Sequence, residues 1–125
     1  MELDTATVER LVDAQVSAIS EPSLVALIEK LRVPPRRELR GWSYGPPHAF
    51  PCWLILEHRP SNTGIAYCTD GFGPKAPWGL LWLSGARMDM GDDSAWFISL
   101  ADALRDSQVM LDAQGGHVVL YGRRD

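Results

Sequence analysis

Residues 52–70 read CWLILEH-RPSNT-GIAYCTD, two apolar runs separated by a polar segment that contains proline and asparagine. Pro60 suits the first position of a turn, and Asn62 tolerates the left-handed backbone conformation that closes a short hairpin loop. We therefore predict a β-hairpin with strands over Cys52–His58 and Gly64–Asp70. Because apolar residues fall on both of its faces, the hairpin is expected near the centre of a sheet that is covered at least partly on each side.

Further short elements are predicted after this hairpin. The apolar runs Trp78–Ser84 and Trp96–Ser99 are bounded by turn residues and have the length of strands. Ser99–Asp102 is a capping-box pattern, which predicts the start of a short helix. Val109–Leu111 and His117–Tyr121 flank a glycine-containing turn and predict a closing hairpin.

Two helices are predicted before the hairpin, because apolar side chains recur there at helical spacing in two narrow stripes. The first stripe comprises Val8, Leu11, Val12, Val16 and Ile19, and the second comprises Leu24, Leu27, Ile28 and Leu31. Pro22 suits the first turn of the second helix. Pro34 and Pro35 end that helix, since proline removes a backbone donor and disfavours helical geometry in the residue before it.

The order of elements predicts an α+β fold, with two N-terminal helices packed on a mainly antiparallel sheet and one short helix inserted near the C-terminus. The 125 residues fit a single domain over 1–125, and 46% hydrophobic with 22% charged residues is a globular composition. The net charge of −4 disfavours nucleic acid as a partner. No signal peptide is recognisable and no apolar run approaches the ~20 residues of a membrane span, so we expect a cytoplasmic protein with no membrane contact.

Charge is unevenly distributed along the chain. A basic cluster comprises Arg32, Arg36, Arg37 and Arg40, and an acidic loop contains Asp89, Asp92 and Asp93. Such runs usually mark solvated surface, and the alternative is that the basic cluster meets an acidic partner protein. The acidic loop lacks the alternating oxygen spacing of a calcium site, so no calcium is expected.

Cys52 and Cys68 are the two cysteines of the chain. The predicted hairpin register sets Leu54 opposite Cys68, which makes the two thiols diagonal neighbours roughly 7–8 Å apart. That separation is too large for easy bridging. The sequence therefore predicts two reduced, largely buried structural thiols.

No catalytic or metal-binding motif is recognisable. The possible ligands His48, Cys52, His58 and Cys68 lack the close spacing of zinc sites. There is no GxSxG nucleophile turn and no phosphate-binding glycine loop. We therefore predict no catalytic residue, no metal and no cofactor. Whether the protein is an enzyme stays open, and the missing motifs favour a protein without catalytic activity.

Aromatic side chains occur in two loops rich in glycine and proline. Segment 70–79 carries Phe72 and Trp78, and segment 41–45 carries Trp42 and Tyr44. Loops of this composition often present large aromatics to a partner, so these four are the predicted partner-binding residues. The alternative is that they fold back over the sheet as a lid on the core.

The preferred functional hypothesis is a non-enzymatic, cytoplasmic protein-binding domain with an unidentified protein partner. A homodimer is also expected, because a second copy would cover exposed aromatics near Trp42 and Trp78. The alternative hypothesis is a small-molecule-binding protein or small hydrolase, with a pocket under the 70–79 loop and with His48 and Cys52 at its mouth.

Residues 99–104, Ser-Leu-Ala-Asp-Ala-Leu, resemble the strand-to-helix endings of a class of small bacterial immunity proteins. The resemblance covers about ten residues of common capping chemistry. It implies an interaction protein, such as an immunity or accessory protein of a bacterium, and it transfers no functional residue.

Overall fold

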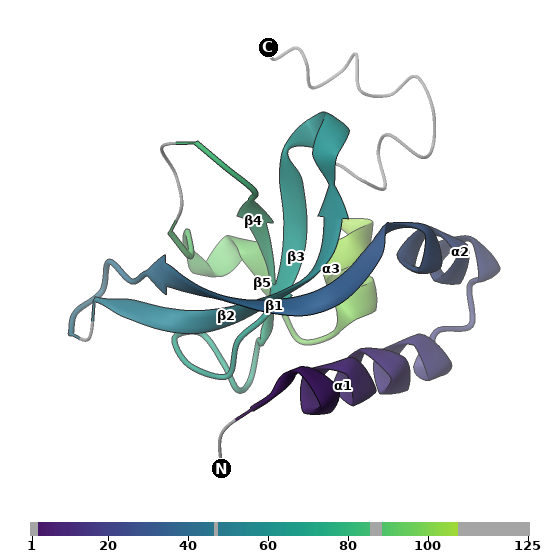
Figure 1. Cartoon of the computed structure of the whole chain (residues 1–125), viewed down its shortest axis with the longest axis horizontal. Helices are drawn as coiled ribbons and strands as arrows, with labels where there is room; N and C mark the ends of the chain where they lie inside the picture. Colours follow the sequence, from purple (N-terminus) through teal and green to yellow (C-terminus); the bar gives the residue numbers. More distant parts are fainter. Residues whose placement is uncertain (1–2, 47, 86–88, 108–125) are drawn as a thin grey trace.

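A five-stranded antiparallel sheet and three helices make up the chain in this computed structural model, which describes residues 3–46, 48–85 and 89–107 (Figure 1). The elements are α1 (Thr5–Ala18), α2 (Pro22–Leu31), β1 (Arg32–Gly41), β2 (Ala49–His58), β3 (Thr63–Tyr67), β4 (Trp78–Trp82), β5 (Trp96–Phe97) and α3 (Leu100–Arg105), with 3-10 turns at Arg59–Ser61 and Asp93–Ala95. Strand order follows chain order. The predicted α+β fold is confirmed, and the predicted hairpin over Val109–Leu111 and His117–Tyr121 lies outside the described residues.

The helices cover one face of the sheet and form a first core with it. The helix side chains of this core that are at most 1% exposed are Val8, Val12, Leu24, Ile28, Leu100, Ala103 and Leu104. They pack against strand residues that include Trp53, Ile55, Ile65 and Trp78. Both predicted apolar stripes therefore belong to the core, although five of their nine members are only partly buried: Leu11, Val16, Ile19, Leu27 and Leu31.

β1 is a strand that the sequence analysis did not predict. It forms an edge of the sheet and contains both Pro34 and Pro35. Its pairing with β2 is irregular between Arg32 and Arg36, where the prolines lie. Proline cannot donate to a strand ladder, but it is tolerated at a sheet edge or a bulge. Pro34 and Pro35 are therefore incompatible with a longer α2 but compatible with an edge strand.

The predicted register of the β2–β3 hairpin is wrong by two residues. In the structure Leu54 lies opposite Ala66, not Cys68. The turn takes one residue fewer than predicted, because His58 pairs with Thr63. A bulge then sets both Ile55 and Leu56 on the helix-covered face, which moves the pairing by one residue more. Asn62 does close the turn in the left-handed conformation, with φ of 59°.

The sheet curls around a second core on its other face. Arg40 Nη1 on β1 donates a hydrogen bond of 2.9 Å to the Trp82 carbonyl at the end of β4. Three strand spacings separate these strands, about 14 Å in a flat sheet, which is more than an arginine side chain spans. Met90 N also donates to the Gly41 carbonyl at 3.0 Å, so the segment after β4 returns to β1. The buried residues of this second core are Cys52, Ala66, Cys68, Leu81, Met90 and Trp96.

Candidate binding surface

Four aromatic rings gather where the β1–β2 loop meets the loop between β3 and β4. The Trp42 ring centroid lies 4.9 Å from that of Tyr44, 5.4 Å from that of Phe50 and 4.9 Å from that of Phe72. All three contacts are edge-to-face, the arrangement that ring quadrupoles favour. We call Trp42, Tyr44, Phe50 and Phe72 the aromatic patch; it unites three of the four predicted partner-binding residues.

Gly71 allows the two loops to approach each other. Its φ of +63° is a left-handed conformation that favours glycine, and a Cβ there would lie 2.8 Å from Met90 Cε and 3.1 Å from Trp42 Cζ3. A backbone hydrogen bond of 2.9 Å from Gly73 to Asp70 fixes the same loop. The patch is therefore held by defined loop geometry.

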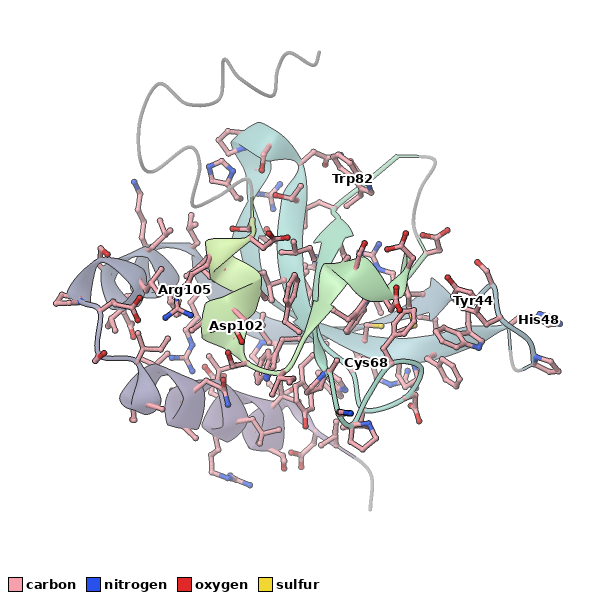
Figure 2. The ribbon with its side chains drawn as sticks, turned by 180° about the vertical axis from the view of Figure 1, so that it is seen from behind. Tyr44, His48, Cys68, Trp82, Asp102 and Arg105 are labelled. Carbon is pink, nitrogen blue, oxygen red and sulfur yellow. The ribbon has the colours of Figure 1, made fainter. Side chains whose placement is uncertain are left out.

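The patch is partly a lid and partly exposed surface. Trp42, Phe50 and Phe72 are half-buried and pack against the second core. Tyr44 is 61% exposed. Figure 2 shows Tyr44 and His48 together near the outer end of the β1–β2 hairpin, on the side of the molecule away from the helices. Each of the two interpretations given from the sequence thus describes part of the cluster.

Trp78, the fourth predicted partner-binding residue, is a core residue in this structure. It is 2% exposed and its ring centroid lies 4.7 Å from that of Tyr67. Tyr67 and Trp78 are opposed across β3 and β4, and both face the helices. Trp78 therefore presents no surface to a partner in this conformation.

One carboxylate of the acidic loop, that of Asp89, lies on a residue next to the aromatic patch. A parallel bridge joins Asp89 to Gly41, the residue before Trp42. Among the described residues, Asp89 and Asp92 accept hydrogen bonds only from their own loop, at Gly91 N and at Ser94. The hydrogen bonds from Ser94 lower the pKa of Asp92, which keeps it ionised. Within residues 3–46, 48–85 and 89–107, no ion pair involves Asp89, Asp92 or Asp93.

The basic cluster, in contrast, is largely neutralised within the domain. Its ion pairs join Arg32 to Glu9 and Asp13, Arg36 to Glu38 and Glu57, and Arg40 to Glu38. Hydrogen bonds with Glu57 and then Glu38 raise the pKa of Arg36. Most of the positive charge of this cluster is therefore already paired, which weakens its interpretation as a surface for an acidic partner.

The alternative pocket does not form from the residues predicted for it. A hollow of about 470 Å³ does lie at the start of the 70–79 loop, lined by Leu3, Asp4, Arg37, Pro51, Trp53, Thr69 and Asp70. His48 is exposed on the hairpin loop, and Cys52 is buried on the opposite face of the sheet. Among the described residues, no histidine or cysteine lines the hollow, so none of the described histidines is placed there to activate a nucleophile.

One histidine does contact a hydroxyl group elsewhere. His58 Nδ1 lies 2.7 Å from Ser61 Oγ in the β2–β3 turn. Ser61 Oγ also donates to the His58 carbonyl at 3.2 Å and lies 2.6 Å from Thr63 Oγ1. These short-range contacts are typical of side chains that close a turn, and we assign them that role.

The described residues contain no group of three or more side chains placed to hold a metal ion. No helix in that part of the chain is long and apolar enough to cross a membrane. Comparisons with protein-family models, with curated proteins and with solved structures find no match to this chain.

Proposed function

We propose that this chain is a non-enzymatic protein-binding domain and that the aromatic patch is its partner surface. The observation that carries the proposal is the convergence of Trp42, Tyr44 and Phe72 from two loops into one partly exposed cluster. Rigidly held aromatic side chains supply large contact area at low entropic cost and are enriched among residues that dominate binding energy.

The partner expected at this surface is a basic segment of another protein. Asp89 borders the patch through its bridge to Gly41, Asp92 and Asp93 follow it in the same acidic loop, and within the described residues no cation offsets their charge. A lysine or arginine can pair with these carboxylates and also lie over an aromatic face. The net charge of −4 favours the approach of a cationic partner as well.

The proposal extends to a cytoplasmic location and to a role as an immunity or accessory protein of a bacterium. Cys52 and Cys68 are buried and free, which fits a reducing compartment. The bacterial role is supported only by the short resemblance at residues 99–104.

Replacing Tyr44 with alanine is expected to reduce capture of the partner about tenfold or more while leaving the fold intact. The side chain is 61% exposed, so its loss costs little stability, whereas an aromatic at the centre of an interface contributes about 2 kcal/mol or more. The wild-type domain, Tyr44→Ala and Ile98→Ala serve as baits, and captured proteins are quantified by mass spectrometry. Ile98 is the control, an apolar side chain that is 69% exposed and lies outside both the patch and the acidic loop.

We expect basic proteins to be recovered by the wild type and by Ile98→Ala, and their recovery to fall about tenfold or more with Tyr44→Ala. Equal recovery by all three baits would contradict the assignment of the surface.

The homodimer stays a prediction. It now rests on Trp42 and Tyr44 alone, because Trp78 is buried. Sedimentation velocity at tens of micromolar decides it: a dimer formed through the patch dissociates on Tyr44→Ala, and a monomeric wild type rules it out.

A further inference from the structure

Cys52 and Cys68 face each other across β2 and β3. Trp53 lies opposite Tyr67 and Leu54 opposite Ala66, so the next opposed positions in this register are Cys52 and Cys68. Cys68 N donates to the Pro77 carbonyl at 2.9 Å, so the Cys68 backbone groups point toward the β4 side and away from β2. The two cysteines are therefore a non-hydrogen-bonded antiparallel pair.

Such a pair has the geometry that a disulfide requires. Cα atoms in non-hydrogen-bonded pairs are about 4.5 Å apart, and disulfides join Cα atoms about 4.4–6.8 Å apart. The diagonal arrangement expected from the sequence excluded a bridge, and the corrected register removes that objection.

Each thiol donates to a backbone carbonyl, Cys52 Sγ to that of Phe50 at 3.8 Å and Cys68 Sγ to that of Asp70 at 3.6 Å. The adjacent Cys68 thiol, followed by burial, raises the pKa of Cys52. The adjacent Cys52 thiol lowers the pKa of Cys68. Cys68 is thus the better nucleophile of the pair, because the thiolate is the attacking species.

We propose that Cys52 and Cys68 form a redox site, a dithiol that closes reversibly to a cross-strand disulfide by exchange with a low-molecular-weight disulfide. The redox site does not rest on the proposed partner binding.

The exchange balances as two displacements. The Cys68 thiol loses its proton to solvent, and its sulfur attacks one sulfur of the oxidant, releasing one half of the oxidant as a thiolate. The Cys52 thiol then loses its proton, attacks Cys68 Sγ in the mixed disulfide and releases the other half. The protein loses two electrons and two protons, and the oxidant is reduced to two thiols.

The aromatic patch controls access to this site. Cys52 is 1% exposed and Cys68 is fully buried, and Trp42, Phe50 and Phe72 pack over the core that contains them. An oxidant can reach the sulfurs only when this cover opens locally. Removal of the Phe72 ring should therefore accelerate oxidation.

The test incubates the full reduced chain with excess glutathione disulfide and follows intact mass and free thiols. We expect both thiols to be lost together, with a mass decrease of about 2 Da, no retained glutathione and recovery on reduction. The oxidised chain should melt roughly 10 °C higher, because the bridge restricts the unfolded state. Retention of two thiols, a stable glutathione adduct, or cross-linked dimers as the product would overturn the proposal.

Two variants separate access through the patch from general loss of stability. Phe72→Ala should oxidise about tenfold faster or more, because it opens the cover directly. Leu27→Ala, a partly buried residue of the first core, is the control for destabilisation. Equal acceleration in both variants would show that oxidation follows global unfolding and that the aromatic patch does not control access to the thiols.

Discussion

A chain that begins at Arg32, without α1 and α2, is expected to lose cooperative unfolding altogether. The truncation removes Val8, Val12, Leu24 and Ile28, each at most 1% exposed. Full burial of one such side chain contributes roughly 1.5–3 kcal/mol, and whole domains are stable by only about 5–15 kcal/mol. The truncation also uncovers the helix-covered face of the sheet. Thermal unfolding followed by circular dichroism measures the outcome.

A matched pair of substitutions supports this test at single-residue level. Ile28→Ala should cost about 2–5 kcal/mol, because Ile28 is fully buried and its truncation leaves a cavity. Ile98→Ala makes the same change at a side chain that is 69% exposed and should cost about 0.5 kcal/mol or less. If the shortened chain kept the parent melting temperature, the helices would be a detachable arm and their stripes a candidate partner surface.

Gly79→Ala is expected to destabilise the domain by about 3 kcal/mol or more. Gly79 lies opposite Trp96 across β4 and β5, and a Cβ added there would overlap the Trp96 indole ring. The ring cannot easily move, since it is 5% exposed and its Nε1 donates a 2.7 Å hydrogen bond to the Met90 carbonyl. Urea unfolding of the variant and the wild type gives the difference in free energy.

A second substitution tests whether the cost of Gly79→Ala comes from overlap between the new methyl group and the Trp96 ring. Trp96→Leu removes the ring that the new methyl group would meet, so Gly79→Ala should cost much less in that background. Additive effects of the two substitutions would mean that the cost of alanine at this position does not come from the Trp96 ring.

The elements governed by local chemistry could be predicted from the sequence. The Ser99 hydroxyl accepts a hydrogen bond of 3.1 Å from Asp102 N at the start of α3, as the capping pattern indicated. The left-handed Asn62 and the two helical stripes follow equally local rules. β1 could not be predicted in the same way. Its two prolines indicate the end of regular structure, and a strand tolerates them here because β1 lies at the edge of the sheet.

Features that depend on register or on distant residues escaped prediction. A turn one residue shorter than predicted and a bulge at Ile55–Leu56 together bring Cys52 opposite Cys68. The curl of the sheet unites Trp42 with Phe72, which lie in separate loops. The neutralisation of Arg32 depends on Glu9 and Asp13, far away in the sequence.

The chemistry of the partner can be measured before the partner is known. A random peptide library displayed on phage is selected against the wild-type domain, and selected peptides are then tested against Tyr44→Ala and against a variant with asparagine at Asp89, Asp92 and Asp93. We predict enrichment of lysine and arginine beside apolar residues, with binding that weakens in both variants and at high salt. Peptides without positive charge, or peptides that bind Tyr44→Ala as tightly as the wild type, would contradict it.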